Sequence, residues 1–376
     1  MIERDHPGHG EARTAPASSS TPRGRPPGAG EDAGDPGTTT PRPPRRRRHV
    51  RPAEEPAEGG RGNMRRFAAA AAGVALMVLG IGPGGSVAAT PPPPAGTNLQ
   101  VLSWNMCDVV RWGGCTERRT AEKVALLKRQ VTEKYVQAML LQEVCQSTLK
   151  ELGRQLGPAW SVHFTPYHWS QKGTLTVSPC ATKPGTSEPA DPDDDVGTAI
   201  VVKAGLEDPA LYPTIRPSTQ LVPPFQCATA AYFGVRLCNA HLPRSQSDDD
   251  FPGLDYRDDH LLAVKDVVED HPQVVFGGDF NTQPPDAGAS SAKVWKPAEL
   301  YSTGTGQPGY AECDQAGLPG TTRPRTGRPT HSSDVKIDYL FGSLPGRWCD
   351  VEPDAPAGAA NLSDHRYLIY SVVVAP

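Results

Sequence analysis

Residues 274–281, Val-Val-Phe-Gly-Gly-Asp-Phe-Asn, decide the fold prediction. A short apolar run with two β-branched residues, bounded by glycines, is typical of a buried strand, so we predict a strand over Val274–Gly277. Asp279 and Asn281 follow at its carboxyl end. An Asp-x-Asn sequence by itself is often only a turn, so its meaning depends on the residues that end the other strands.

Five more segments place a polar residue at the end of an apolar strand or inside one. Each has a structural explanation when taken singly, because a Glu after a strand is often solvated and a lone strand-end His is often structural. Together they match one chemistry: hard divalent cations prefer carboxylate and amide oxygens, and phosphoryl transfer uses histidines near the reacting oxygens. The set contains four carboxylates, two amides and two histidines: Glu143, Asp279, Asp338, Asp364, Asn105, Asn281, His241 and His365.

The pattern from residue 98 onward predicts an α/β domain. Helical apolar stripes alternate early with short β-branched runs, and hairpin-like pairs follow, which favours two packed mixed β-sheets flanked by helices. Helices are expected over Thr120–Tyr135, Ser147–Leu156 and Tyr256–Asp270, and further strands over Leu99–Trp104, Ala138–Gln142, Thr198–Val202, Ala228–Phe233, Val235–Leu242, Lys336–Phe341 and Tyr367–Val374. Residues 170–195 and 204–224, rich in Pro, Thr, Ser and Asp, are expected to be long loops.

The motifs resemble those of a known family when read in order. They are Trp-Asn at 104–105, Gln-Glu at 142–143, His-Leu at 241–242, Gly-Asp-Phe-Asn at 278–281, Ile-Asp-Tyr at 337–339 and Ser-Asp-His at 363–365. This order is similar to that of the endonuclease/exonuclease/phosphatase superfamily, which includes deoxyribonuclease I. The resemblance covers most of residues 98–376. It implies a metal-dependent phosphoric diester hydrolase with a four-layer α/β sandwich, in which two mixed sheets are flanked by helices.

The resemblance also implies a metal site at the matching positions. Glu143 is expected to be the principal Mg²⁺ ligand, with Asn105 nearby contacting the metal or the phosphate. Asp364 is expected to lie at the same metal site. Mn²⁺ and Ca²⁺ are alternatives, and whether one ion or two are bound stays open.

The other five residues are expected to act on the phosphate. By resemblance, Asp279 orients or deprotonates the attacking water, and Asn281 holds a phosphate oxygen. His365, held by a carboxylate, hydrogen-bonds the scissile phosphate, while His241 stabilises the phosphate or protonates the leaving oxygen. Asp338 completes the polar ring. Which histidine is the acid stays open.

The sequence departs from the family pattern in the middle of the chain. Nucleases of this family commonly offer a Tyr or Arg there that touches the phosphate, but residues 197–200, Gly-Thr-Ala-Ile, carry neither. Tyr167, His168 and Arg244 are the candidate substitutes. Nucleic acid, a lipid headgroup and a small phosphoester therefore stay open as substrates.

The first 97 residues differ in composition from the rest. Residues 1–63 have almost no large apolar side chains, so we predict a disordered extension, with the arginines at 45–48 solvated. Residues 64–89 show the basic, apolar and small-residue regions of a secretory signal peptide, and translation that begins at Met64 is an alternative start. The apolar run of about 15 residues is too short to span a membrane, so no anchor is expected. Residues 90–97 form a Pro-rich linker before a catalytic domain over 98–376.

The cysteines indicate an oxidising compartment. All eight lie between Cys107 and Cys349, and their even number favours disulfides in a secreted protein, whereas no Cys-x-x-Cys pair suggests zinc. Proximity in sequence proposes two pairs directly, and elimination supplies the rest. The expected pairs are Cys107–Cys115, Cys227–Cys238, Cys145–Cys180 and Cys313–Cys349.

Two acidic runs suggest calcium at first sight, at residues 191–195 and 248–250. The first has Asp at relative positions 1, 3 and 5, but Gly197 falls one place late for an EF-hand loop and Val202 occupies the place of the last Glu. We therefore expect solvated acidic loops.

The function expected from these features is a secreted nuclease that acts on DNA or RNA as a monomer. Without its first 89 residues the chain has 25 basic and 33 acidic residues, and this net charge of −8 weakens nonspecific binding to a polyanion. The alternatives are a phospholipase C or sphingomyelinase-like enzyme, although no basic amphipathic helix is visible, and a phosphatase of small esters. A non-catalytic binding module is disfavoured, because every motif keeps its chemically competent residue.

Overall fold

The computed structural model divides the chain into two units, residues 1–82 and residues 83–376. The described residues all belong to the second unit and are 94, 96–109, 112, 115, 117–171, 174–182, 189–214, 221–244, 255–296, 298–301, 309–315, 325–353 and 361–374. The expected extension, the signal peptide, most of the linker and the acidic run at 248–250 lie outside the described residues. None of the described helices is long and apolar enough to cross a membrane.

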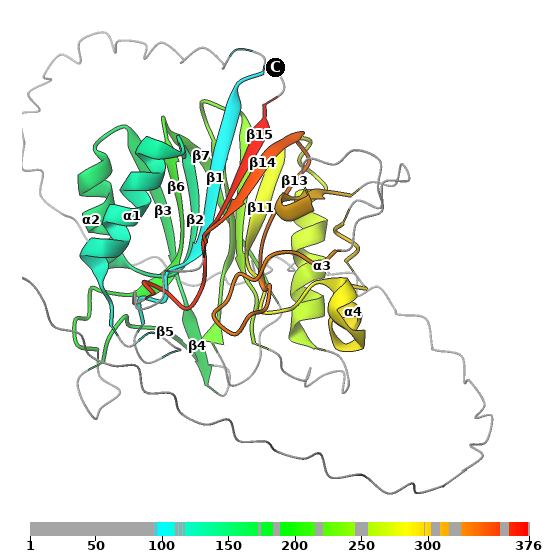
Figure 1. Ribbon diagram of the computed structural model, residues 1–376. Helices are drawn as coiled ribbons and strands as arrows, with labels where there is room; N and C mark the ends of the chain where they lie inside the picture. The colour runs from blue at the N-terminus through cyan, green and yellow to red at the C-terminus, as the bar shows by residue number, and fades with distance from the viewer. Residues whose placement is uncertain are drawn as a thin grey trace, which may run out of the picture. The chain divides into compact units, whose positions relative to one another are not determined.

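The first sheet contains six strands in the order β14-β15-β1-β2-β6-β3. Its central strands β1 and β2 are parallel, and the other pairs are antiparallel. Two helices pack on its outer face (Figure 1). The elements are β1 (Asn98–Asn105), α1 (Thr120–Glu133), β2 (Ala138–Cys145), α2 (Gln146–Leu156), β3 (Trp160–Pro166), β6 (Val196–Lys203), β14 (Gly346–Val351) and β15 (Leu368–Val373).

The second sheet also contains six strands, in the order β12-β13-β11-β10-β9-β7, with β10 and β11 parallel. Helices α3 and α4 lie on its outer face (Figure 1). Its elements are β7 (Leu206–Tyr212), β9 (Phe225–Ala230), β10 (Val235–His241), α3 (Tyr256–Val268), β11 (Val274–Asp279), α4 (Ala289–Trp295), β12 (Ala311–Glu312) and β13 (Asp338–Gly342). A small third sheet contains β4 (His168–Gln171), β5 (Thr174–Val177) and β8 (Leu221–Val222).

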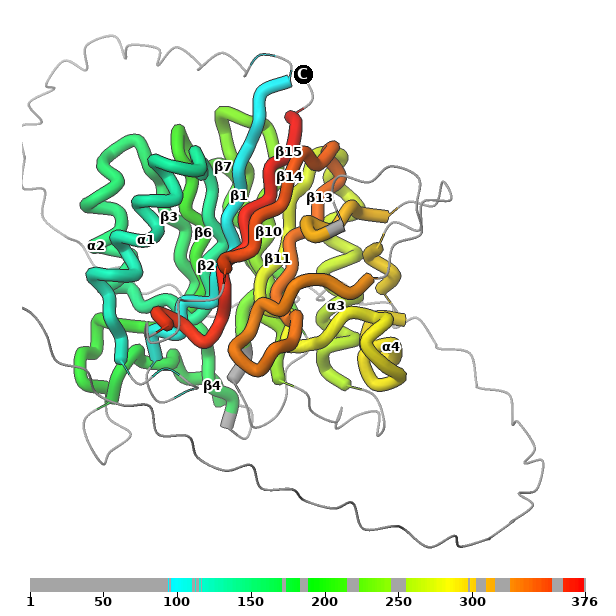
Figure 2. The backbone as a smooth tube through the Cα atoms, viewed as in Figure 1, coloured from blue at the N-terminus to red at the C-terminus, as the bar shows by residue number. Residues whose placement is uncertain are grey.

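Alternation along the strands builds the layers. In β1, Leu99 and Val101 belong to the cluster buried between the two sheets, while Leu102 and Trp104 pack with the helices outside. Figure 2 shows β1, β2, β10 and β11 running side by side through the middle of the fold. The expected four-layer α/β sandwich, with two mixed sheets flanked by helices, is therefore confirmed.

The predicted secondary structure was wrong at the sheet edges. The stretches expected to be long loops contain β5 within 170–195, and β7 and β8 within 204–224. Strand β7 is an edge strand with a bulge between Glu207 and Ala210, and Pro209 inside it disguised the pattern, because proline is tolerated at edges and bulges. The other boundaries shift by one to three residues, so that Asp338 begins its strand instead of lying within it.

The four expected cysteine pairs are confirmed. The structure joins Cys107 to Cys115, Cys145 to Cys180, Cys227 to Cys238 and Cys313 to Cys349. Cys227 and Cys238 are register partners on β9 and β10, so this disulfide staples the expected hairpin.

We predict that the denatured, unreduced protein shows no reactive thiol, because every cysteine is paired. Reduction should lower the free energy of unfolding by ~2–4 kcal/mol for each disulfide that is broken. Thiol titration in denaturant, and denaturant unfolding with and without reductant, measure the two effects. Several reactive cysteines in the unreduced protein would contradict the pairing.

Candidate active site

The polar strand ends meet because of strand register. Asp279 on β11 is the partner of His241 on β10 and of Asp338 on β13. Side chains alternate between the two faces of a strand. Each of the three lies an even number of residues along its strand from a side chain that is buried between the sheets, so all three point to the inner face. On the first sheet, Asn105 lies an even number of residues from the buried Val101 on β1. Its side chain therefore also points between the sheets and faces His241, Asp279 and Asp338. The site therefore sits where the seam between the two sheets reaches one end of the strands.

The two glycines before Asp279 allow this close approach. A Cβ at Gly278 would lie 1.9 Å from the carbonyl oxygen of Ala240, and one at Gly277 would lie 2.0 Å from that of Tyr339. Gly278 also has a φ of +135°, which side chains rarely adopt. A side chain at Gly278 would push apart the strands that carry His241 and Asp279, and one at Gly277 would push apart those that carry Asp279 and Asp338.

Glu143 reaches the site because β2 is irregular. The register shifts between Leu141 and Val144, and Glu143 adopts a φ of 48°. A regular strand would turn its side chain toward the helices, but the bulge turns it into the cavity. Its withdrawal from water, together with the nearby Asp279, raises the pKa of Glu143 to about 7.

Asn105 links the carboxylates of both sheets. Its Nδ2 lies 3.0 Å from Asp279 Oδ2 and 3.3 Å from Glu143 Oε1, and donates to both. Its Oδ1 accepts from the backbone N–H of Cys107 at 3.0 Å, which fixes the orientation of the amide. Asn105 thus presents a hydrogen-bond donor to the site, and its role as a metal ligand stays a prediction.

His365 forms a buried ion pair with Asp338. Its Nδ1 lies 2.9 Å and 3.1 Å from the two carboxylate oxygens of Asp338, and Thr330 Oγ1 donates to one of them at 2.7 Å. Burial lowers the pKa of His365, but Asp338 and then Asp279 raise it by more, to about 10. His365 is therefore an imidazolium near neutral pH, and its Nε2 lies 3.7 Å from Asp279 Oδ2.

Hydrogen bonds join the Trp-Asn motif to the Ser-Asp-His motif. The indole nitrogen of Trp104 donates to the carbonyl oxygen of His365 at 3.1 Å, and Ser363 Oγ donates to the carbonyl oxygen of Asn105 at 2.8 Å. The backbone N–H of His365 in turn donates to Ser363 Oγ at 3.0 Å. These three hydrogen bonds fix His365, which lies in a loop, to the end of β1.

His241 has a different partner. Its Nδ1 lies 2.7 Å from the hydroxyl of Tyr167, and its Nε2 lies 3.4 Å from Asp279 Oδ2 and 3.2 Å from Asn281 Nδ2. Burial lowers the pKa of His241 more than the attraction of Asp279 raises it. His241 is therefore neutral where His365 is charged.

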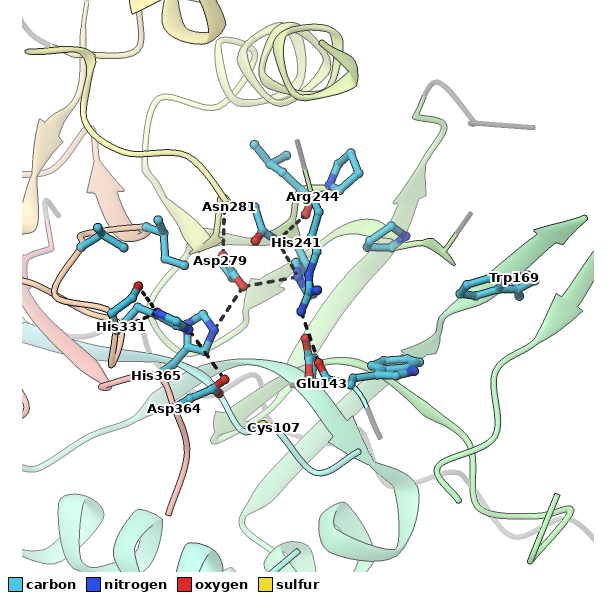
Figure 3. Close-up of a pocket in the computed structure, with 17 residues that line it drawn as sticks. Cys107, Glu143, Trp169, His241, Arg244, Asp279, Asn281, His331, Asp364 and His365 are labelled. Atoms are coloured by element: carbon cyan, nitrogen blue, oxygen red, sulfur yellow. Dashed lines mark hydrogen bonds and ion pairs between the residues drawn. The ribbon is translucent and has the colours of Figure 1, made fainter. Parts of the chain in front are cut away.

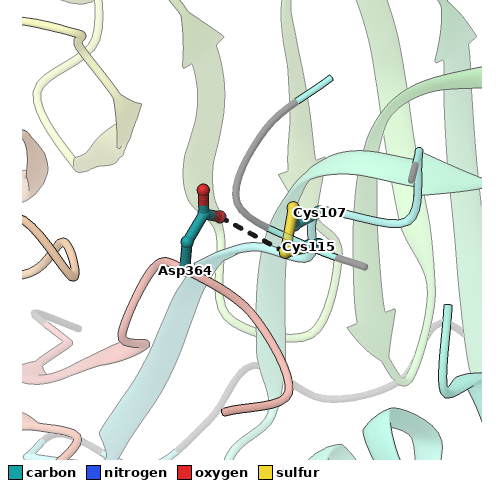
Figure 4. A group of neighbouring side chains, drawn as sticks. All are labelled: Cys107, Cys115 and Asp364. Carbon is teal, nitrogen blue, oxygen red and sulfur yellow. Dashed lines mark hydrogen bonds between the residues drawn. A yellow bond between two sulfur atoms is a disulfide. The ribbon is translucent and has the colours of Figure 1, made fainter. Parts of the chain in front are cut away.

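Asp364 lies beside the Cys107–Cys115 disulfide (Figure 4). Its Oδ1 is 3.5 Å from Cys115 Sγ, but a disulfide sulfur has no hydrogen to donate and is not a thiolate ligand. Its Oδ2 is 3.6 Å from Nε2 of His331. Asp364 therefore has one side against a rigid disulfide and the other against a histidine.

His331 was missed in the sequence and lines the site. The backbone N–H of Ser333 donates to its Nδ1 at 3.1 Å, and its ring centroid lies 4.7 Å from that of His365. A β-bridge joins His331 to His365. No sequence signal marked it, because Thr-His-Ser at 330–332 does not end an apolar run.

These residues line a cavity of about 550 Å³ (Figure 3), a size typical of ligand sites. Six of the eight predicted residues line it, while Asn105 and Asp338 are buried behind the lining. The six are Glu143, His241, Asp279, Asn281, Asp364 and His365. The structure thus brings the whole predicted set together, six in the wall and two in support.

Of the three candidate substitutes for the missing phosphate contact, only Arg244 lines the cavity. Tyr167 is fully buried behind His241, so it cannot reach a phosphate in the cavity. His168 lies on β4 outside the lining. Arg244 also donates from Nη2 to the carbonyl oxygen of Trp112 at 3.2 Å, which directs its guanidinium along the wall.

The acidic run at 191–195 is not simply a solvated loop. Asp194 is buried, pairs with Arg118 at 2.6 Å and accepts from the backbone N–H of Ser147 at 2.8 Å, in the first turn of α2. The expectation of a solvated loop was wrong for this residue, because its carboxylate caps a helix.

Comparison with known proteins identifies the family. The family model described as Endonuclease/Exonuclease/phosphatase family matches residues 102–365. The chain belongs to this family. Endonuclease/exonuclease/phosphatase proteins hydrolyse phosphodiesters and depend on a divalent metal ion, so this chain is an enzyme of that class. A comparison with curated protein sequences found no match.

Solved structures show the same fold at low sequence identity. An endonuclease/exonuclease/phosphatase from Beutenbergia cavernae DSM 12333 has a TM-score of 0.50 and 16% identity, over 74% of this chain and 72% of that one. A family protein from Leptotrichia buccalis C-1013-b has a TM-score of 0.47 and 16% identity, over 73% and 99%. D. rerio TDP2, complexed with single strand DNA product, has a TM-score of 0.47 and 13% identity, over 73% and 98%.

The residues present fit a divalent cation. The side chain of Glu143 accepts a hydrogen bond from the neutral Asn105 amide and lies close to Asp279, so a cation would offset the cost of two neighbouring carboxylates. In the described part of the chain, one group with metal-ligand spacing joins Asp279, Asp338 and His365, and another joins His331 and Asp364 to His365. Because a protonated His365 has no lone pair for a metal, only the other members of these groups are candidate ligands. Glu143 belongs to neither group, whereas Asp364 belongs to the second, and the assignment of both as ligands stays a prediction.

Proposed function

We propose that this protein is a secreted, Mg²⁺-dependent phosphodiesterase that cleaves nucleic acid. The carboxylates and histidines of the cavity support hydrolysis of a phosphodiester. The observation that carries the choice of nucleic acid is the set of aromatic and basic side chains that line the same cavity.

Aromatic rings and one guanidinium line the cavity together with the catalytic residues. They belong to Trp112, Trp169 and Arg244, and Trp169 on β4 is 44% exposed. Aromatic faces that stack bases beside a cation that follows the phosphates are how proteins hold single-stranded nucleic acid without reading its sequence. A choline headgroup would also suit a tryptophan, but the positive charge of Arg244 in the same cavity repels it.

The carboxylates and histidines of the cavity have different roles in the proposed reaction. Asp279 accepts hydrogen bonds from Asn105 and Asn281 and orients or deprotonates the attacking water. The charged His365 donates to a phosphate oxygen, where negative charge grows in the transition state. A divalent cation held by Glu143 and Asp364 would neutralise further charge on the phosphate.

Export is supported by two independent features. Residues 64–89 have the pattern of a secretory signal peptide, and four disulfides are typical of proteins outside the cytosol. N-terminal sequencing of the protein recovered from culture medium would test this. Full-length protein retained in the cytosol would contradict it.

We predict that the purified protein with Mg²⁺ hydrolyses oligonucleotides, and that Trp169→Ala raises KM for them. Loss of one stacked base costs ~1–3 kcal/mol, which corresponds to roughly a 5- to 150-fold rise. The assay compares plasmid DNA, single-stranded DNA, RNA, sphingomyelin and a phosphomonoester. Tyr135→Ala, which removes an exposed aromatic outside the cavity, is the control. Turnover of sphingomyelin or the monoester alone would overturn the proposal.

A further inference from the structure

Tyr167 lies between two residues of the site, Glu143 and His241. It follows β3 directly, is fully buried and stacks on Trp112, with ring centroids 5.9 Å apart and planes 18° apart. Its hydroxyl contacts the backbone nitrogen of Glu143 at 3.0 Å and Nδ1 of His241 at 2.7 Å. One oxygen atom therefore connects the bulge that aims Glu143 with the ring of His241.

Hydrogen-bond accounting fixes the direction of these contacts. The backbone N–H of Glu143 is always a donor, so the Tyr167 oxygen accepts from it. The single phenolic hydrogen is then available for Nδ1 of His241, which must accept it. The one proton of the neutral ring consequently sits on Nε2, where it faces Asp279 Oδ2 at 3.4 Å.

The opposite tautomer fits less well. A proton on Nδ1 would give the Tyr167 oxygen two donors and leave its own hydrogen without an acceptor among its described contacts. The bare Nε2 would then point its lone pair at a carboxylate. The Asn281 amide, 3.2 Å from Nε2, donates one hydrogen to the carbonyl oxygen of Leu242 at 2.9 Å, and only its second hydrogen would favour that arrangement, against the carboxylate of Asp279.

We propose that Tyr167 is a positioning residue that locks His241 as a neutral Nε2–H donor aimed at the phosphate. This deepens the proposed phosphodiesterase function and rests on it. The two histidines of the site thus have different partners: Nδ1 of His365 lies against the carboxylate of Asp338, and Nδ1 of His241 lies against the hydroxyl of Tyr167.

The first test observes the proton directly. In the full-length protein with ¹⁵N-labelled histidine, the signals of His241 are those that disappear in His241→Gln. The proposal predicts a pyridine-type Nδ1 and a pyrrole-type Nε2 at neutral pH. A pyrrole-type Nδ1, or two pyrrole-type nitrogens, would overturn it. This measurement does not depend on activity, so a lack of phosphodiesterase activity alongside the expected signals would overturn only the proposed function.

The second test removes the hydroxyl. Tyr167→Phe should lose the fixed tautomer and lower kcat on the order of 10-fold, with KM unchanged, because the donor loses its alignment and the substrate contacts remain. Tyr370→Phe, the same change at a tyrosine buried between the sheets, is the control and should alter neither. An unchanged His241 spectrum and an unchanged kcat in Tyr167→Phe would overturn the proposal.

Discussion

Glu143→Gln is expected to lower metal-dependent phosphodiester hydrolysis by roughly 10³-fold or more, and Asp279→Asn by a similar factor. Each substitution removes one negative charge from the proposed cation site and keeps the volume of the side chain. The amide that replaces the Glu143 carboxylate retains an oxygen that accepts from Asn105, so the fold should persist. Turnover at matched Mg²⁺ concentrations, with circular dichroism as a check of folding, measures the effect.

Asp279→Asn has a second consequence within the site. The carboxylate of Asp279 is shared by the Asn105 amide, His241 and His365, so an amide in its place turns one acceptor into a donor. Glu151→Gln is the matched control, because Glu151 is a surface carboxylate on α2 that pairs with Arg154. Full activity of either site variant would remove that residue from the catalytic assignment.

Substitution of His241 or His365 by Ala is expected to cost ~10² to 10⁴ in kcat, the range for a group that transfers or donates a proton in the transition state. The two residues are far apart in the chain, yet both lie beside Asp279. Because residues that act on one phosphate fail as a unit, the double variant should lose less than the product of the two single losses.

The Mg²⁺ affinity of the variants distinguishes the expected role of the histidines from that of the carboxylates. Mg²⁺ binding should survive in both histidine variants, since we propose that the carboxylates hold the ion, and calorimetry measures it. His163→Ala, on β3 and outside the cavity, serves as the control. A double variant whose loss of kcat equals the product of the two single losses would contradict the shared-phosphate arrangement. A histidine variant with lower Mg²⁺ affinity would contradict it as well.

The sequence predicted the central strands better than the edges for a physical reason. Strands such as β1, β2 and β11 are buried on both faces, so they read as apolar runs. In the two large sheets, the strands that were missed, β3, β7, β12 and β14, are all sheet edges. Edge strands carry polar side chains and tolerate proline and glycine, so their pattern resembles that of a loop.

The residues of the candidate site also fall into those that the sequence predicts and those that it does not. Glu143, Asp279 and His365 could be predicted because each follows a buried strand or belongs to a distinctive motif. The roles of Tyr167 and His331 could not be assigned, since they depend on contacts with residues distant in sequence, His241 and His365. The bulge that turns Glu143 inward likewise arises from pairing with β6, which no local pattern reveals.

The most direct test of the central claim is the dependence of oligonucleotide hydrolysis on metal in the wild-type protein. After removal of metal with a chelator, the rate should fall to background, and added Mg²⁺ should restore it along a saturable curve. Glu143→Gln should shift that curve to higher Mg²⁺ or abolish it. Full hydrolysis in excess chelator would contradict a metal-dependent phosphodiesterase site in this cavity.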